Sequence, residues 1–264
     1  MDKYKMILQV QPRLSEKEEW KGLSEKEGLS YELLEFSMPG RLSGSLREEG
    51  LSYYRNTGRA VSFHGAFIDV NPASAEPEIR KISRKIMEKS CLEAVEAGCT
   101  DLVFHAGAHP FLNGIYLHSW ARNTADYYSE LFEKYGVRIH AENSADAYPD
   151  ALSELMEALS GRTGVDICLD IGHANYSKTP LSDWFSALGE TIGYVHLSDN
   201  QGKYDDHLPV GSGTVLWEEA DRLIRKYHSV QKITIEMNSM EDVKTSLSYI
   251  RARHLFEQNH ETAG

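Results

Sequence analysis

Short apolar or β-branched runs that end in His, Asp or Glu recur along this chain of 264 residues. Each run has the composition of a buried strand and carries a metal-type ligand at or near its carboxyl end. Ligands on separate strands can act together only if the strand ends converge, and a closed parallel barrel brings them together at its carboxyl-terminal rim. The runs are Ser62-Phe63-His64, Val103-Phe104-His105, Ile139-His140-Ala141-Glu142, Cys168-Leu169-Asp170, Tyr194-Val195-His196 and Thr234-Ile235-Glu236.

Strand and helix patterns alternate along the whole sequence, and such alternation indicates a parallel sheet. Strands are predicted near residues 5–10, 30–36, 60–66, 101–106, 137–142, 166–171, 192–197 and 232–237. Helices are predicted near 15–28, 43–57, 76–98, 118–135, 150–160, 180–189, 216–228 and 241–257. Eight strand–helix units without a composition break predict an α/β fold, a single (β/α)₈ TIM barrel of eight parallel strands formed by residues 1–264 as one domain. The first two units have the weakest patterns, so the first strands are expected to be irregular.

The helix at 76–98 has the clearest pattern. Ser74 can cap its start, and Pro77 suits its first turn. Apolar residues at helical spacing predict that the helix packs through Ile79, Ile82, Ile86 and Val95.

Charge and cysteine content favour a cytoplasmic protein that acts on small molecules. The chain has 28 Lys and Arg against 40 Asp and Glu, for a net charge of −12, and no basic block offers a footprint for nucleic-acid phosphates. Its three cysteines suggest a reducing compartment rather than a disulfide framework. Neither a signal peptide nor an apolar stretch of about 20 residues is evident, so no membrane association is expected. An oligomer is left open, because Trp120, Trp184 and Trp217 could form an interface or be buried.

The strand-end residues form a predicted ring of metal ligands. Glu142, Asp170, His196 and Glu236 supply three carboxylates and one imidazole, a set that suits one Mn, Mg, Co, Fe or Zn ion in an open site. Further candidate ligands would allow two or three ions, namely His64, His105, His173, Asp205 and His207.

A structural role must be weighed against each of these assignments. A single strand-end histidine is more often a hydrogen-bonded structural residue than a ligand. Several carboxylates in one barrel mouth argue against this for the first four, because buried carboxylates are costly without a cation or donor. Hydrogen bonding to substrate or to ligands would explain the other five. His140 shares the face of Glu142 and is interpreted as an inner-layer polar residue with a structural role.

The segment from His196 to Gly213 is the most specific motif. It reads His-Leu-x-Asp-Asn-x-Gly-x-x-Asp-x-His-Leu-Pro-x-Gly-x-Gly and resembles the signature of the xylose isomerase-like TIM barrels. This superfamily contains sugar (phosphate) isomerases and epimerases and the endonuclease IV type of apurinic-site nuclease. Three other stretches, at 64–69, 141–143 and 168–175, resemble family segments in the same order.

The resemblance implies different chemistry in the two branches. In the isomerases and epimerases, the positions that match Glu142, Asp170, His196 and Glu236 hold one divalent metal, and the two glutamates act as acid and base. In the nuclease, all nine matching positions bind three zinc ions. This chain has all nine ligand types, but its loops are short and poor in Lys and Arg. It also carries Tyr148 and Gly202 where the ketohexose epimerases have glutamate and arginine, which argues against a free ketohexose as substrate.

The leading hypothesis is metal-assisted isomerisation or epimerisation of a small hydroxy-carbonyl compound, such as a sugar or sugar phosphate. Glu142 or Glu236 would remove a proton beside the carbonyl and the other would return it. His173 and Lys203 would orient the substrate, and Phe67, His64 and His105 would line its site.

Two other hypotheses stay open. One is a multi-zinc phosphoesterase of the endonuclease IV type, for which DNA would be the partner. The other is a non-catalytic barrel that binds sugar or metal, although all the ligand positions retain a coordinating side chain.

Overall fold

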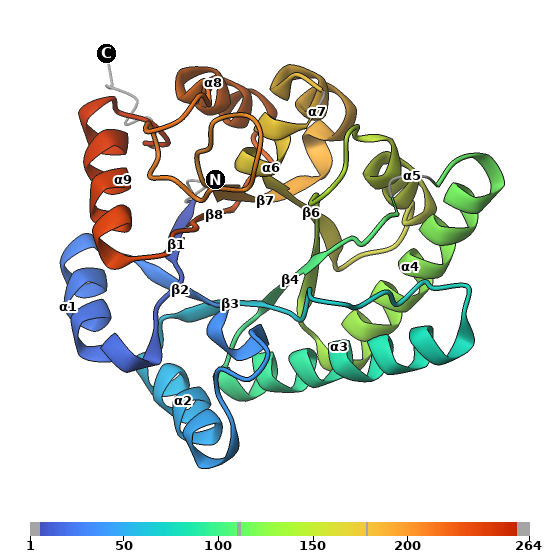
Figure 1. Cartoon of the computed structure of the whole chain (residues 1–264), viewed down its shortest axis with the longest axis horizontal. Coiled ribbons are helices and arrows are strands. Elements are labelled where there is room, and N and C mark those ends of the chain that lie inside the picture. Colours follow the sequence, from blue (N-terminus) through green and yellow to red (C-terminus); the bar gives the residue numbers. More distant parts are fainter. Residues whose placement is uncertain (1–5, 110–111, 178, 258–264) are drawn as a thin grey trace.

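The computed structural model describes residues 6–109, 112–177 and 179–257, and they form a closed barrel of parallel strands surrounded by helices (Figure 1). Neighbouring strands pair in chain order, and β1 closes the barrel by pairing with β8. The predicted (β/α)₈ barrel is therefore confirmed. The strands are β1 Ile7–Val10, β2 Ser30–Leu33, β3 Ala60–His64, β4 Asp101–His105, β5 Arg138–Glu142, β6 Val165–Asp170, β7 Ile192–Leu197 and β8 Lys232–Ile235.

The helices agree with the predicted pattern apart from a few residues at their ends and one addition. They are α1 Lys17–Glu27, α2 Gly44–Thr57, α3 Pro77–Ala97, α4 Gly114–Tyr135, α5 Asp150–Ala158, α6 Ile171–Tyr176, α7 Leu181–Leu188, α8 Trp217–Tyr227 and α9 Met240–Ala252. Short 3₁₀ turns occupy Leu14–Glu16, Glu35–Ser37 and Gly189–Thr191. The sequence did not predict α6, because six residues are too few to show a helical period.

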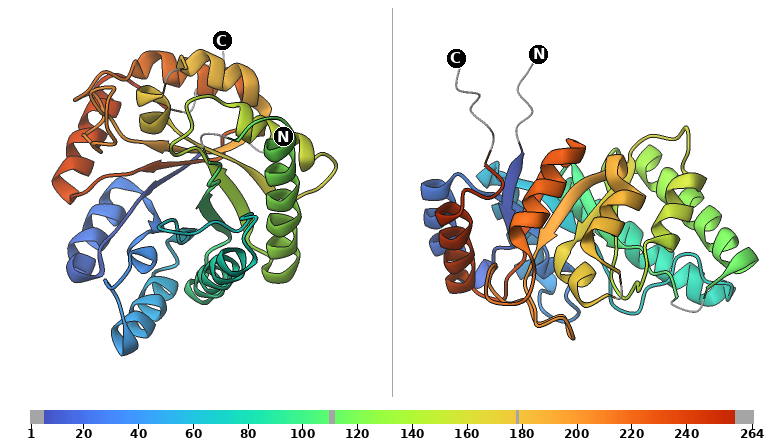
Figure 2. Two further views of the ribbon diagram at one scale, coloured as in Figure 1. Left: turned by 45° about the vertical axis from the view of Figure 1, so that its right-hand side comes forward. Right: turned by 90° about the horizontal axis from the view of Figure 1, so that it is seen from above.

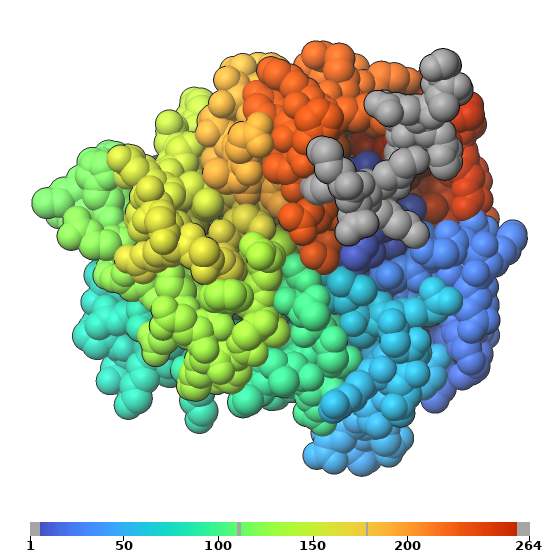
Figure 3. Space-filling model, turned by 180° about the vertical axis from the view of Figure 1, so that it is seen from behind, coloured from blue at the N-terminus to red at the C-terminus, as the bar shows by residue number. Residues whose placement is uncertain are grey.

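The chain travels once around the barrel, so its first and last elements lie side by side. Figure 2 shows α1 next to α9, and Figure 3 shows the colours following each other around the molecule from blue to red. The irregularity expected of the first strands is small: β1 and β2 are short but paired, and the register shifts at Tyr31 and Glu32. No helix in the described part of the chain is long and apolar enough to span a membrane.

Most of the apolar core lies between the strands and the helices, and the barrel interior is largely polar. Trp120, Trp184 and Trp217 are all buried in the outer layer. Inside the barrel, Val103, Cys168 and Tyr194 form a small apolar cluster. Because side chains alternate along a strand, the residues two positions further on also point inward, at the rim. This period places His105, Asp170 and His196 above that cluster.

Charged groups fill the opposite, amino-terminal end of the barrel. Asp101 accepts a hydrogen bond from His140 Nε2 at 2.8 Å and pairs with Lys232 Nζ at 2.9 Å. His140 Nδ1 also contacts Asp166. The structural interpretation of His140 therefore agrees with its surroundings, which lie on the far side of the small apolar cluster from the strand-end ligands.

The apolar pattern of α3 was misread in one respect. Ile79, Ile82, Ile86 and Val95 are 40–58% exposed rather than packed. The helix instead buries a face of small and flexible residues that includes Ser83, Met87, Cys91 and Ala94, because small side chains let it lie close to the barrel. Pro77 begins the helix as predicted, but Glu76 rather than Ser74 caps it.

Candidate metal centre

The predicted carboxylates and imidazole lie close together at the carboxyl ends of four strands. Glu142 and Asp170 end β5 and β6, His196 lies in β7, and Glu236 directly follows β8. One potential ligand atom from each of these residues lies within 4.8 Å of those from the others, and all four residues are buried. The structure thus brings this predicted group together.

The arrangement fits a cation. Glu142 Oε2 and Asp170 Oδ2 are buried and make no well-aligned hydrogen bond with the described residues, although two imidazole nitrogens lie near Glu142 Oε2. Orphaned carboxylate oxygens in a buried site are costly unless a cation or donor meets them. Carboxylate and imidazole donors suit Mn²⁺, Mg²⁺, Fe²⁺, Co²⁺ or Zn²⁺. These residues could therefore hold a divalent ion.

His64 and His105 form a second potential group with Glu142. Their Nε2 atoms lie 3.3 Å and 3.4 Å from Glu142 Oε2. His64 also comes near His196 and Glu236, and Cys168 comes near Glu142 and His196. The predicted histidines are therefore part of one continuous cluster with the four-ligand group.

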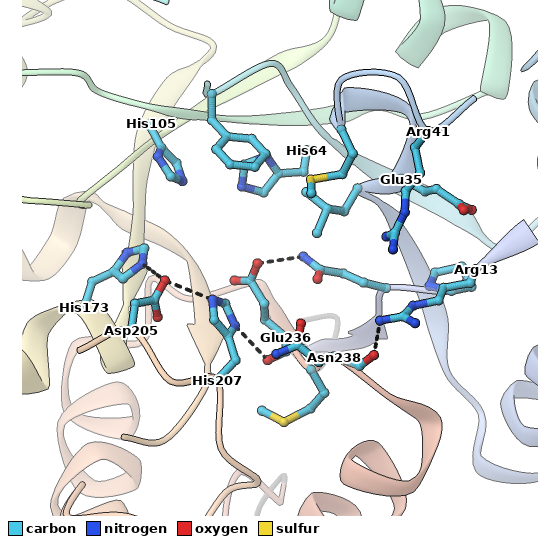
Figure 4. Close-up of a pocket in the computed structure, with 16 residues that line it drawn as sticks. Arg13, Glu35, Arg41, His64, His105, His173, Asp205, His207, Glu236 and Asn238 are labelled. Atoms are coloured by element: carbon cyan, nitrogen blue, oxygen red, sulfur yellow. Dashed lines mark hydrogen bonds and ion pairs between the residues drawn. The ribbon is translucent and has the colours of Figure 1, made fainter. Parts of the chain in front are cut away.

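His173, Asp205 and His207 form the outer part of the ring. Asp205 Oδ2 lies 3.3 Å from His173 Nε2 and 3.0 Å from His207 Nε2 (Figure 4). His173 Nδ1 lies 3.7 Å from Glu142 and 3.9 Å from Asp170, which links this part to the four-ligand group. All nine predicted ligands therefore lie at the same end of the barrel.

Local hydrogen bonds explain how the chain presents Asp170 and His173. The Asn143 amide accepts from the backbone N–H of Asp170 at 2.7 Å and donates to its carbonyl at 3.0 Å. Asp170 then caps α6 by accepting from the N–H of His173 at 2.5 Å. The Nδ1 of His173 donates to the carbonyl of Asn143 at 2.7 Å, so its Nε2 faces Asp205. The unpredicted helix α6 thus orients a predicted ligand.

Asp199 anchors the long loop between β7 and α8 that presents Asp205 and His207. It is fully buried and accepts hydrogen bonds from the backbone N–H groups of Gly211 and Val215 and from Trp217 Nε1, at 2.9–3.1 Å. Figure 1 shows this orange loop curling over the barrel. The aspartate of the sequence motif therefore fixes a loop rather than lining the centre.

Sequence reasoning missed Glu32, which lies inside the barrel beneath His196. Glu32 is fully buried, and its Oε2 accepts hydrogen bonds from His196 Nε2 at 2.9 Å and Tyr194 Oη at 2.5 Å. Gln11, also missed, donates to Glu32 Oε1 at 2.7 Å and to Glu236 Oε1 at 3.2 Å. An acidic residue in the middle of a short apolar strand was the available signal for Glu32.

Burial and opposite charges compete in setting the pKa values of the centre. Burial opposes ionisation of Glu142 and Glu236, but His196 outweighs it, so the pKa of Glu142 lies well below its usual value and that of Glu236 falls to about 2. Burial raises the pKa of Asp170 to about 6 and lowers that of His105 to about 4. For His173, burial is outweighed by Asp170 and Asp205, and the pKa is raised well above its usual value. Both glutamates are therefore ionised at neutral pH.

A pocket of about 200 Å³ opens above these residues (Figure 4). The predicted residues His64, Phe67, His105, His173, Asp205, His207 and Glu236 line it. Glu142, Asp170 and His196 lie beneath its lining. Lys203 is exposed and is not among the lining residues, whereas Arg13 and Arg41, which the sequence did not single out, do line it.

The chain belongs to the xylose isomerase-like TIM barrel family, whose profile matches residues 23–253. An uncharacterized protein of Methanocaldococcus jannaschii is 28% identical over 202 residues, which cover 72% of this chain and 69% of that protein. A probable endonuclease 4 of Mycobacterium tuberculosis is 25% identical over 208 residues, which cover 73% of this chain and 78% of that protein.

Solved structures share the fold of this chain. A D-tagatose 3-epimerase-like protein superposes with a TM-score of 0.74 at 23% identity, covering 94% of this chain and 96% of the other. A Thermus thermophilus protein from a crystal soaked with ZnCl₂ has a TM-score of 0.73 at 25% identity, covering 94% and 97%. The family relationship predicted from the motif is confirmed by the family profile. Probable endonucleases 4 are among the sequence relatives, and an epimerase-like protein shares the fold.

Proposed function

We propose that the protein is a divalent-metal-dependent isomerase or epimerase that acts on a small hydroxy-carbonyl compound. The observation that carries the proposal is the buried group of Glu142, Asp170, His196 and Glu236, in which two carboxylate oxygens make no well-aligned hydrogen bond with any described residue. The four residues would hold one ion, which would polarise adjacent carbonyl and hydroxyl oxygens of a substrate.

The two glutamates are suited to move a proton. Glu142 Oε1 and Glu236 Oε2 lie 3.1 Å and 2.9 Å from the same atom, His196 Nδ1, so their carboxylates are close neighbours. Both are ionised at neutral pH, as a general base must be. One would take the proton from the carbon beside the carbonyl, and the C–H electron pair would move to form an enediolate. The other, which is ionised at rest, would first take up a proton from solvent and then pass it to carbon, and the first would release its proton to solvent.

The surrounding residues would bind and orient the substrate. His173 and His207 are fixed by Asp205 at the edge of the pocket, where their imidazole rings would limit the positions that a substrate can take. Phe67 packs against His64 and His105, with ring centroids 5.1 Å apart in each case, and would give the substrate an apolar contact on that side of the pocket. The small volume of the pocket suits a small molecule.

A multi-zinc phosphoesterase is the second candidate. The observation in its favour is that His64, His105 and Glu142 form a further potential metal group beside the first. DNA would be its partner, yet the net charge of −12 opposes binding to a polyanion. A non-catalytic binding barrel remains the third candidate, and it predicts metal or sugar binding without turnover.

Exchange of substrate hydrogen with solvent tests the proposal. The metal-loaded protein would be incubated in D₂O with a panel of hydroxy-ketones, hydroxy-aldehydes and their phosphate esters, and deuterium at the carbon beside the carbonyl would be followed by NMR. We expect incorporation that disappears on metal removal and in Glu236→Gln. No exchange with any compound, or exchange that survives Glu236→Gln, would overturn the proposal.

A further inference from the structure

Two guanidinium groups line the pocket on the side away from the histidines. Arg13 follows β1, and Arg41 lies between β2 and α2. In Figure 4 they lie near one another, with His105 and His173 on the other side of the pocket and Glu236 between the two sides. The pocket therefore has cationic side chains across from the outer histidines.

Neither arginine is neutralised by a carboxylate in the described part of the chain. The chain is acidic overall, and several of its other arginines have such partners: for example, Arg47 pairs with Glu93 and Arg162 with Asp126. Arg13 donates only to the carbonyl of Asn238, and the side chain of Arg41 has no hydrogen bond or ion pair with any described residue. Both guanidinium groups thus keep N–H donors for a ligand.

The acidic residue nearest in the pocket lining does not remove this capacity. Glu35 lines the same pocket, but its Oε2 accepts a hydrogen bond from the backbone N–H of Leu14 at 2.7 Å. It does not form an ion pair with Arg13 or Arg41 among the described contacts. A guanidinium group presents its donors in a planar fork that matches the oxygens of a phosphate or carboxylate.

We propose that Arg13 and Arg41 form an anion-binding subsite, so that the substrate carries a phosphate or carboxylate group in addition to its hydroxy-carbonyl unit. The inference rests on the proposed function for the hydroxy-carbonyl unit, and it names the chemical class of the rest of the substrate. The anionic group would lie against the arginines, and the reacting carbons would lie against Glu236. Binding at both ends would fix the orientation of a small molecule in the pocket.

Reduced substrate analogues test the subsite without requiring turnover. A hexitol, the corresponding hexitol phosphate and the corresponding aldonate have no carbonyl group and cannot react. Their affinities for the metal-loaded protein would be measured by titration calorimetry. We expect at least one of the two anions to bind about ten- to a hundredfold more tightly than the neutral hexitol, as charge-assisted hydrogen bonds allow. The stronger of the two identifies the anionic group.

Variants separate the arginines from the metal as the source of this preference. Arg41→Gln and the double variant Arg13→Gln/Arg41→Gln should reduce it stepwise while leaving hexitol affinity and metal content unchanged. Arg122→Gln, on the exposed face of α4 and outside the pocket lining, is the matched control and should behave as the unmodified protein. Equal affinity for all analogues, or a preference that survives the double variant, would overturn the subsite.

The affinity measurements and the deuterium-exchange assay together distinguish failure of the subsite from failure of the proposed function. An anion preference that depends on the arginines, with no deuterium exchange in any carbonyl compound, would retain the subsite and reject the isomerase. Deuterium exchange without an anion preference would retain the isomerase and reject the subsite. Duplex DNA with an abasic site is the third arm, and its cleavage in an Arg41-dependent manner would assign the arginines to DNA phosphates and overturn the small-substrate subsite.

Discussion

Glu32 holds the imidazole of His196 from inside the barrel, with Oε2 2.9 Å from Nε2. Because Nε2 donates to this carboxylate, Nδ1 is directed toward Glu142 and Glu236. Tyr194 and Thr234 also donate to Glu32 Oε2, at 2.5 Å and 3.1 Å, and so fix the carboxylate in turn. A carboxylate behind a histidine ligand commonly sets its tautomer and orientation.

Glu32→Gln should therefore weaken metal binding without unfolding the protein. The glutamine amide can donate to Nε2, which would move the imidazole proton to Nδ1, the atom that faces the candidate metal site. We expect the metal dissociation constant to rise about 10- to 100-fold in a competition titration. Nitrogen NMR of the metal-free and metal-loaded protein reports the tautomer directly. Tyr194→Phe is the control, because it removes the hydrogen bond from Tyr194 Oη to Glu32 Oε2 and leaves the Glu32 carboxylate in place. Unchanged affinity in Glu32→Gln would contradict the positioning role.

Asp205→Asn separates a one-ion site from a larger cluster. In the proposed one-ion site, Asp205 fixes His173 and His207 but does not hold the ion. The variant should keep the same number of metal ions per chain, while kcat falls about tenfold or more because charge-assisted hydrogen bonds worth about 1.5–3 kcal/mol each are weakened. Elemental analysis and steady-state kinetics on the same sample check both parts. Loss of metal from the variant would instead indicate that Asp205 is a ligand.

Asp101→Asn should destabilise the barrel at its amino-terminal end. The variant leaves the charges of His140 and Lys232 facing a neutral group, and breaking a buried ion pair costs about 3–5 kcal/mol. Burial opposes ionisation of Asp101, but the hydrogen bond and charge of His140 and the charge of Lys232 outweigh it, so its folded pKa lies well below its usual value.

The sign of the pH dependence follows from that lowered pKa. The stabilisation by Asp101 is fully present above its unfolded pKa of about 3.9 and is lost as pH falls through the lower folded pKa. Urea unfolding of metal-free protein should thus show a difference of about 3–5 kcal/mol between the two proteins near pH 6, which shrinks below about pH 4 as Asp101 takes up a proton. The difference should also decrease at higher pH, where His140 loses its proton; burial lowers the pKa of His140, but Asp166 and Asp101 outweigh burial and raise that pKa above its usual value. A difference that grows as the pH falls below about 4 would be inconsistent with the ionised Asp101.

Substitutions on α3 should show how its apolar residues are distributed. Ile82 is 58% exposed, so Ile82→Gln should change the free energy of unfolding by no more than about 0.5 kcal/mol. Met87, on the buried face of the same helix, is the matched control, and Met87→Ala should cost about 2–5 kcal/mol. Denaturant unfolding of both variants provides the comparison. A large loss in Ile82→Gln would indicate that this face is covered.

The sequence predicted the barrel well because its inward residues repeat with the period of a strand. Cys168 and Asp170, or Tyr194 and His196, differ by two positions, so each pair shares a face and its second member reaches the rim. That regularity also predicted six of the nine ligand candidates, and the spacing of residues in the segments after β6 and β7 predicted the other three, His173, Asp205 and His207. The structure places all nine together, although their roles remain predictions. The orientation of the third helix was predicted less well. Apolar residues at helical spacing show that they share one face of the helix, but not whether that face packs on the barrel or lies exposed to solvent.

The sequence could not reveal residues whose importance depends on convergence of distant segments. Glu32 and His196 are 164 positions apart, and only barrel closure places one beneath the other. Arg13 and Arg41 lie in loops without a periodic pattern, so the sequence contained no signal that they share a pocket with Glu236. Lys203 shows the converse, since its place in the motif predicted substrate contact but its side chain is exposed outside the pocket lining.

Metal content per chain, measured by elemental mass spectrometry on protein purified without chelator, tests the central claim most directly. The proposed one-ion site predicts about one equivalent of Mn, Mg, Co, Fe or Zn per chain, lost in Glu236→Gln and retained in Asp205→Asn. Two to three equivalents of zinc, or retention of the ion in Glu236→Gln, would contradict the one-ion isomerase site, and the first result would favour the phosphoesterase.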